Sequence, residues 1–250
     1  MSVATRLDRL LANMGYGSRR EMQQLVKQGG VTLDGAPVKV ADMKVDVGLD
    51  LSDRLKIRGA RLDPPPGLVL MMHKPVGVTC SHKDAGVLVY SLLPNRWRAR
   101  EPAISTVGRL DKETSGLLLL TDDGDLLHRI ISPRKQVAKR YLARLARPLD
   151  GGEAALFAAG GLILEGDDKP VAPALLEPIS PNQAYLTVTE GRYHQVRRMF
   201  AAVGNRVEAL HRDRIGALEL PTDLEPGRYR LMTPDEINAI FAPGASESAA

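Results

Sequence analysis

The sequence contains a single cysteine, Cys80, so an internal disulfide is excluded. A lone thiol fits a protein of the reducing cytoplasm, where disulfides are rare. No apolar run approaches the roughly 20 residues that a membrane-spanning helix requires. Residues 1–6 also lack the apolar core of a secretory signal. We therefore expect a cytoplasmic protein that makes no contact with a membrane.

Closely grouped metal ligands are absent as well. The five histidines do not show the paired spacing of a zinc site, and residues 122–125 do not match the spacing of a calcium loop. A turn is the simpler interpretation of those acidic residues. We expect neither a metal nor a cofactor.

Positive charge is in moderate excess, with a formal net charge of +4 and a pI near 9.2. Residues 129–147 carry seven Lys or Arg and no acidic residue, and residues 192–214 carry six Arg. Either stretch alone is typical of a solvated basic face. Because the two stretches flank a candidate active site, together they favour a polyanionic partner such as RNA.

The first sixty residues are expected to form a compact unit with two short helices. Leu7, Leu10 and Leu11 follow helical spacing, and Ser18 with Glu21 forms a capping-box pattern before a second helix. Residues 31–33 and 38–40 are predicted strands, joined by a turn at residues 34–35. This run resembles the S4-type RNA-binding module, in which Arg19, Arg20 and Lys27 would meet phosphates. A helix-turn-helix unit without a ligand is the alternative.

The remaining chain predicts a mixed α+β domain with a mainly antiparallel sheet. Expected strands lie at residues 68–72, 117–120, 141–145 and 185–188, and expected helices at residues 125–131, 152–159 and 193–203. Three successive prolines favour a semi-rigid linker at residues 61–67. The predicted domains are residues 1–60 for the S4-like α/β module, 68–242 for the catalytic domain and 243–250 for a disordered tail.

The most informative segment is residues 107–124, in which a glycine-bounded loop carries Arg109 and Asp111 and leads into a run of four leucines. Catalytic groups are often found on loops that a rigid strand supports. From the residues alone, a turn stabilised by hydrogen bonds to Asp111 is the favoured interpretation.

The run Gly108–Gly116 resembles the central motif of the pseudouridine synthases, which changes that interpretation. The blocks His73–Gly77, Lys139–Tyr141 and Glu190–Met199 resemble three further motifs of that family in the same order. His73 departs from the family pattern, which more often has Asn there. Together with the S4-like module, these motifs are similar to those of RsuA-type enzymes, which modify uridine in small-subunit ribosomal RNA.

The resemblance implies a role for each matched residue. Asp111 would be the nucleophile, attacking either the ribose or the base, and Arg197 would pair with its carboxylate. Tyr141 would stack on the uracil. The other expected contacts to substrate are Arg109, Lys139, Val196 and Lys74, and Arg192 and Arg198 would contact RNA. For both Arg109 and Lys74, structural support of the loop is the alternative to a contact with substrate.

The expected function is the isomerisation of a uridine to pseudouridine in ribosomal RNA, on free RNA or a pre-ribosomal particle, by a monomer without a cofactor. Large-subunit ribosomal RNA is the nearest alternative substrate. A second alternative is an RNA-binding assembly factor without catalytic activity, which the intact Asp111, Tyr141 and Arg197 disfavour. A glycoside hydrolase using Asp111 and Glu113 is a poor third, because two carboxylates in one short loop need not face one sugar.

Overall fold

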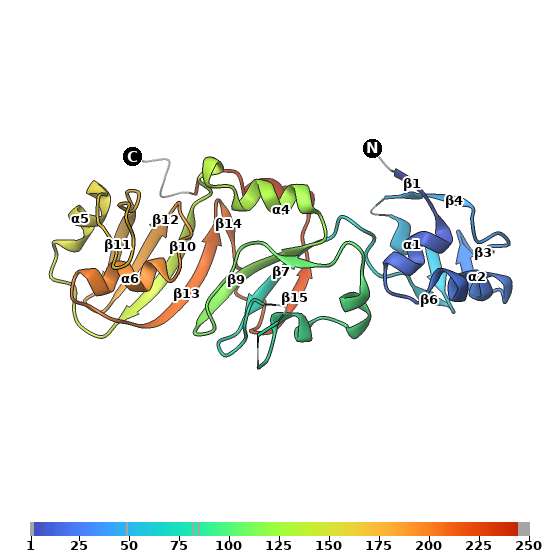
Figure 1. The fold of residues 1–250 in the computed structure, drawn as a ribbon, viewed down its shortest axis with the longest axis horizontal. Helices are drawn as coiled ribbons and strands as arrows, with labels where there is room; N and C mark the ends of the chain where they lie inside the picture. Colours follow the sequence, from blue (N-terminus) through green and yellow to red (C-terminus); the bar gives the residue numbers. More distant parts are fainter. Residues whose placement is uncertain (1–2, 49, 82, 85, 245–250) are drawn as a thin grey trace. The chain divides into compact units, whose positions relative to one another are not determined.

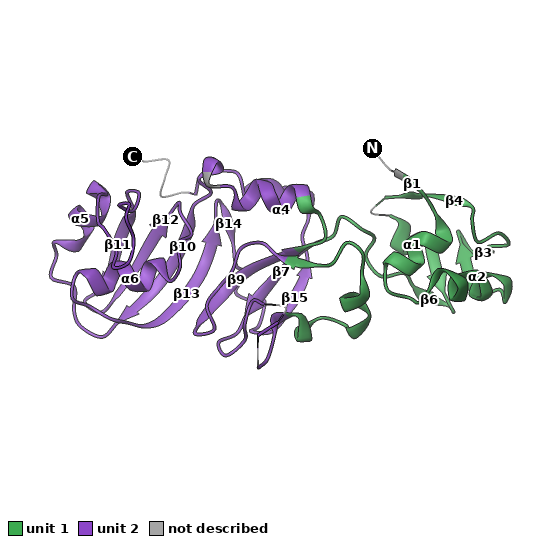
Figure 2. Ribbon diagram, viewed as in Figure 1, with its two compact units in different colours: residues 1–69, 90–105, 121–124 green, residues 70–89, 106–120, 125–250 purple. Residues whose placement is uncertain are grey.

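The computed structural model describes residues 3–48, 50–81, 83–84 and 86–244. The chain divides into two compact units, which Figure 2 shows in different colours. Unit 1 comprises residues 1–69, 90–105 and 121–124, and unit 2 comprises residues 70–89, 106–120 and 125–250.

Unit 1 begins with a small α/β module built around two short helices. Its helices are α1 (Leu7–Asn13), α2 (Arg19–Lys27) and α3 (Leu51–Arg54), and its strands are β1 (Val3–Arg6), β2 (Val31–Leu33), β3 (Ala36–Pro37), β4 (Lys44–Val47), β5 (Leu55–Ile57) and β6 (Ala60–Arg61). The predicted capping box is confirmed, because Ser18 and Glu21 each accept a hydrogen bond from the other's backbone N–H. The apolar faces of α1 and α2 share one core with β2 and β5.

The turn after β2 was predicted correctly, whereas the strand that follows it was not. Asp34 and Gly35 have φ angles of 52° and 81°, which is the left-handed pair that a tight hairpin turn needs. The residues paired with β2 across this turn are Ala36 and Pro37, and residues 38–40 lie outside any strand. The other edge of β2 pairs with β5, a partner distant in sequence.

Hydrogen bonds within unit 1 hold the predicted linker, residues 61–67, at several points. The backbone N–H of Asp63 donates to the Tyr16 hydroxyl, and the Asp63 carboxylate pairs with Arg96 at 2.7 Å. The N–H of Gly67 donates to Asp122, whose carboxylate also forms a fully buried ion pair of 2.9 Å with Arg100. The segment is therefore tethered to other parts of unit 1 along its length.

The second architectural element is a sheet of nine strands in the described part of the chain. Its central order is β11-β12-β10-β13-β9-β7-β15, with β14 beside β13 and β8 beside β9. The strands are β7 (Val69–Lys74), β8 (Ser105–Thr106), β9 (Thr114–Thr121), β10 (Lys139–Leu145), β11 (Leu175–Ser180), β12 (Gln183–Val188), β13 (Val207–Ile215), β14 (Leu218–Glu219) and β15 (Tyr229–Leu231).

Most of the pairings for which a register is defined are antiparallel, whereas β9 and β13 run parallel. The prediction of an α+β fold with a mainly antiparallel sheet is therefore confirmed. The predicted strands at residues 117–120, 141–145 and 185–188 form parts of β9, β10 and β12.

Helices cover the face of the sheet on which β10 and β12 carry their apolar side chains. The α-helices of this part are α4 (Gly124–Ile131), α5 (Glu153–Ala159), α6 (Gln195–Ala202) and α7 (Pro234–Ala239), and the 3-10 helices are η1 (Val89–Leu92), η2 (Asn95–Ala99) and η3 (Pro133–Lys135). Figure 1 shows α5 beside β11, and α6 packs against β13. Phe157 of α5 and Phe200 of α6 meet edge to face at 5.6 Å inside this core.

Gly116 allows β9 and β13 to approach each other. Its φ is 113°, and a Cβ at this position would lie 2.1 Å from the carbonyl oxygen of Arg212. Any side chain would therefore force the two strands apart.

Within the described residues, no helix is both long enough and apolar enough to cross a lipid bilayer. Of the predicted tail, residues 245–250 lie outside the part that the structure describes.

Candidate active site

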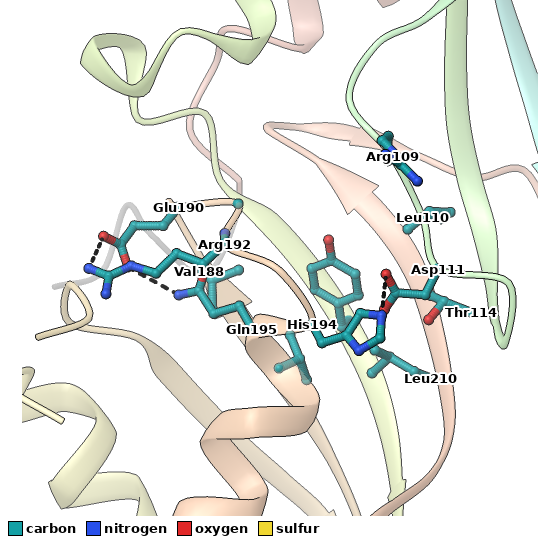
Figure 3. Close-up of a pocket in the computed structure, with 13 residues that line it drawn as sticks. Arg109, Leu110, Asp111, Thr114, Val188, Glu190, Arg192, His194, Gln195 and Leu210 are labelled. Atoms are coloured by element: carbon teal, nitrogen blue, oxygen red, sulfur yellow. Dashed lines mark hydrogen bonds and ion pairs between the residues drawn. The ribbon is translucent and has the colours of Figure 1, made fainter. Parts of the chain in front are cut away.

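A cavity of about 780 Å³ opens in unit 2, with Asp111 and Tyr141 on its walls. A smaller adjoining hollow shares both residues, and Figure 3 shows its lining. The walls come from the loop before β9, from β10, from the segment that precedes α6 and from β13. Since these parts of the chain are distant in sequence, the sheet assembles the site.

Lys74 fixes the loop that carries Asp111. The Lys74 side chain is fully buried, and its Nζ donates to the carbonyl oxygens of Thr114 at 2.7 Å and Asp111 at 3.1 Å. It also reaches the carbonyl oxygens of Pro75 and Lys112. Burial lowers the pKa of Lys74 from its ordinary value. Lys74 therefore supports the loop that carries Asp111, and its amine is occupied by backbone oxygens.

The Asp111 carboxylate contacts His194. Oδ1 of Asp111 lies 3.3 Å from Nε2 of His194, and both side chains are about one-third exposed, at 32% and 38%. His194 is the residue before α6 and adopts a left-handed conformation with φ 48° and ψ 32°. Figure 3 shows its imidazole turned toward Asp111, while Arg192 and Gln195 turn toward Glu190.

Tyr141 and Arg212 stand opposite each other on β10 and β13. Nη1 of Arg212 reaches the Tyr141 hydroxyl at 3.4 Å, and the guanidinium carbon lies 5.9 Å from the centre of the ring. Nε of Arg212 donates to the carbonyl oxygen of Leu117 at 2.8 Å. Nη2 is buried and has no hydrogen-bond partner among the described residues. A fully desolvated cation with an unused donor thus lines the cavity that contains Asp111.

Lys139 faces the same cavity from β10. Its Nζ donates to the carbonyl oxygen of Val137 at 2.8 Å. Burial, together with the positive charge of Arg212, lowers the pKa of Lys139 to about 8. A small change in its surroundings can therefore change the charge of this lysine near neutral pH.

Arg197 occupies a different position from the one expected. Nη1 donates to the carbonyl oxygen of Val207 and Nη2 to that of Glu113, both at 3.0 Å. No ion pair joins Arg197 to Asp111 in the described part of the chain. The expected pairing of Arg197 with Asp111 was therefore wrong. The guanidinium of Arg197 donates to two carbonyl groups and supports the backbone of the Asp111 loop.

Arg192 and Arg198 also have internal partners. Both pair with Asp167, at 3.0 Å and 2.7 Å, and Arg192 pairs with Glu190 at 3.0 Å. Their remaining donors reach carbonyl oxygens of residues 165, 169, 170 and 193. These contacts tie residues 165–170 to the start of α6, so fewer donors remain for phosphates than the sequence suggested.

The other predicted contact residues divide by exposure. Arg109 is exposed on the wall of both hollows, and Val196 is buried beneath the smaller one. In the N-terminal module Arg19, Arg20 and Lys27 are all exposed, and Arg19 also pairs with the buried Asp8 at 3.2 Å. Asp8 also accepts from Arg6 and Gln23; although burial opposes the shift, these bonds hold the pKa of Asp8 well below its usual range.

Arg212 is the site residue that sequence reasoning missed. Its strand, β13, was not predicted, because residues 211–214 are four consecutive polar or charged residues. In the structure the buried positions alternate along this stretch, and they are Leu210, Arg212 and Arg214. The period of two is therefore present in the burial, but two of the buried positions are arginines, so hydrophobicity does not reveal it.

Comparisons with known proteins cover both units. A family model described as RNA pseudouridylate synthase matches residues 68–202, and the S4 domain model matches residues 5–51. The motifs quoted from the sequence lie inside these two ranges.

Similar proteins match the chain over nearly its whole length. The ribosomal small subunit pseudouridine synthases A of Vibrio cholerae serotype O1 and Escherichia coli K12 are each 40% identical, covering 94% of this chain and 99% of their own. An uncharacterized RNA pseudouridine synthase of Bacillus subtilis strain 168 is 41% identical over 96% of this chain and all of its own. A crystal structure of a pseudouridylate synthase superposes with a TM-score of 0.66 at 37% identity, covering 94% of this chain and 99% of that one.

Proposed function

The chain belongs to the RNA pseudouridylate synthase family, and we propose that it converts a uridine of small-subunit ribosomal RNA to pseudouridine with Asp111 as the nucleophile. The observation that carries this proposal is the shared cavity: Asp111, Tyr141 and Arg212 come from three separate strands or loops and line one hollow of about 780 Å³. The relatives named for small-subunit ribosomal RNA support the choice of substrate, since they match almost the whole chain.

The reaction balances without an external reactant. The bond from C1′ of the ribose to N1 of uracil breaks, the base turns, and a bond from C1′ to C5 forms. The C5 proton leaves and N1 takes up a proton, so nothing is oxidised and no water is consumed. A carboxylate that attacks the bound nucleotide divides this exchange into two easier steps.

Each residue around the cavity has a part in this scheme. Asp111 supplies the attacking carboxylate, and Tyr141 presents its ring to the uracil. Arg212 offers a desolvated positive charge, whose electrostatic effect is stronger in a site that excludes water. Lys74 holds the carbonyl group of Asp111 and Arg197 that of Glu113, and together they fix the direction of the Asp111 side chain.

RNA binding is shared between the two units. The S4 module contributes the exposed cations Arg20 and Lys27, together with Arg19, and Arg109 and Lys139 contribute positive charge at the cavity. Contacts of this kind position the phosphate backbone and carry little sequence information. A target base inside folded RNA must leave its stack, at a cost of a few kcal/mol that backbone contacts offset. We propose that the protein acts in this way as a monomer in the cytoplasm.

Chemical mapping of pseudouridine tests the proposal. Unmodified small-subunit and large-subunit ribosomal RNA are incubated separately with the wild-type protein, with Asp111→Ala and with Glu113→Ala. Glu113 is an exposed carboxylate of the same loop, so its variant is the matched control.

We expect one modified uridine in small-subunit RNA from the wild type and Glu113→Ala, and none from Asp111→Ala, which still binds RNA. Product from Asp111→Ala would refute the role of the nucleophile. Product in large-subunit RNA alone would refute the substrate, and RNA binding without any product would point to a non-catalytic assembly factor.

A further inference from the structure

Tyr193 is an aromatic side chain that the reaction scheme does not use. It lies on the wall of the large cavity, and 76% of its surface is exposed. One face of its ring stacks on the imidazole of His194, at 3.9 Å between ring centres and 16° between ring planes. Because one face is covered and the side chain is still largely exposed, the other face is open to a ligand.

The segment that carries this ring is held in place before any ligand arrives. The side chain of Gln195 accepts a hydrogen bond from the backbone N–H of Arg192 and donates to Glu190. Nη1 of Arg198 donates to the carbonyl oxygen of Tyr193 at 3.2 Å. His194 occupies a left-handed conformation between these anchors. A ring fixed in this way loses little conformational entropy on binding.

The surroundings indicate which ligand the open face accepts. The cavity beside Tyr193 carries the cationic side chains of Arg109, Lys139 and Arg212 and the exposed apolar side chain of Ile131. Proteins that bind single-stranded nucleic acid combine positive charge along the backbone with aromatic rings on which bases stack. Extruding a target base also leaves its neighbour without a stacking partner.

We propose that Tyr193, stacked on His194, is the platform for the nucleobase next to the target uridine, and so holds the RNA while that uridine enters the cavity. The inference rests on the proposed function and adds a residue that holds the RNA. His194 also contacts Asp111 (Figure 3). A base stacked on Tyr193 is therefore linked to Asp111 through the side chains of Tyr193 and His194. The platform accepts any base, because stacking depends on the aromatic face and involves no hydrogen-bond pattern.

The test compares full-length wild type, Tyr193→Phe, Tyr193→Ala and Ile163→Ala on unmodified small-subunit ribosomal RNA. Ile163 is the matched control, being 60% exposed in the same unit and absent from the cavity walls. Initial rates of pseudouridine formation give kcat and KM, and thermal melting checks folding. A second readout is the fluorescence of 2-aminopurine placed beside the mapped uridine, which is quenched when the probe stacks.

We expect Tyr193→Ala to lower kcat/KM roughly 5- to 150-fold, mainly through KM, which is the range that corresponds to one base–aromatic stack. Its melting temperature should stay unchanged, and its complex should fluoresce more strongly than that of the wild type. Tyr193→Phe keeps the ring and should stay within about twofold of the wild type, as should Ile163→Ala.

Two results would overturn the inference alone: Tyr193→Ala matching Ile163→Ala, or Tyr193→Phe failing as badly as Tyr193→Ala, since the hydroxyl would then be the important group. A wild-type protein that makes no pseudouridine would overturn the proposed function and this inference with it.

Discussion

Nε2 of His194 lies 3.3 Å from Oδ1 of Asp111, although β9, β10, β11 and β12 separate the two residues in the chain. The contact joins the loop that carries Asp111 to the segment that begins α6. His194 therefore orients the carboxylate of Asp111, while Lys74 holds the backbone carbonyl group of the same residue.

Replacing His194 by Asn should lower kcat by about tenfold, because the carboxylate loses a contact of the strength of a charged hydrogen bond. Asn tolerates the left-handed backbone that His194 adopts, so the start of α6 should be preserved. Single-turnover rates of pseudouridine formation measure the effect. An unchanged rate would show that the contact has no part in catalysis.

Lys74→Met should destabilise the protein by about 3 kcal/mol and lower kcat by more than tenfold. The methionine fills the space but removes the ammonium that donates to the carbonyl oxygens of Asp111 and Thr114. Urea unfolding gives the stability, and rates are measured well below the unfolding transition. Lys112→Met removes an exposed lysine of the same loop and should change neither value.

The charge of Lys139 should make RNA affinity depend on pH. Its pKa of about 8 means that the ammonium is present at neutral pH and is lost as the pH rises through that value. The wild type should bind RNA more weakly at about pH 9 than at about pH 7. Lys139→Arg stays charged, so its RNA affinity should remain high and depend less on pH. Lys139→Met is always neutral, so its RNA affinity should be low and also depend less on pH. RNA-binding titrations at several pH values and constant ionic strength measure these affinities.

The same residue affects stability in the opposite direction. In the unfolded chain Lys139 titrates near its ordinary value of 10.5, so between about pH 8 and 10.5 the unfolded state holds the additional proton. The contribution of Lys139 to the free energy of unfolding therefore rises with pH across this window. Lys139→Met should remove that rise, which denaturant unfolding at several pH values would reveal. A slope that survives the substitution would assign it to another group.

The S4 module should account for part of the salt dependence of RNA binding. Replacing Arg20 and Lys27 together by Ala should reduce the slope of log affinity against log salt by about 1.4 to 1.8, if each contacts one phosphate. Lys169→Ala with Arg206→Ala removes the same charge from exposed positions of the other unit and serves as the control. Equal slopes for both double variants would argue against a specific role of the module.

The sequence predicted those parts of the fold that are determined by residues close together in the chain. The capping box at Ser18 and the turn at Asp34 and Gly35 depend on neighbouring residues, and the leucine run 117–120 is buried on both faces. Asp111, Tyr141 and Lys139 were identified from short sequence motifs, and all three line the cavity.

Features that depend on distant pairing could not be derived in this way. Strand β5 has little pattern of its own and is defined by pairing with β2. Strand β13 buries Arg212 and Arg214, which a hydrophobic pattern places on the surface. Arg197 was assigned to Asp111 by its place in a motif, but backbone carbonyl groups of two other segments determine where its guanidinium lies.

The parallel pairing of β9 with β13 has a consequence for the newly made protein. A nascent chain exposes the S4 module early, because N-terminal parts emerge and fold first. Asp111 and Arg212 cannot line one cavity until β13, which follows β10, β11 and β12 in the chain, has been synthesised and Gly116 has packed against it. Under the proposed function, an unfinished polypeptide is therefore expected to bind RNA before it can modify it, and the order of translation separates the two steps.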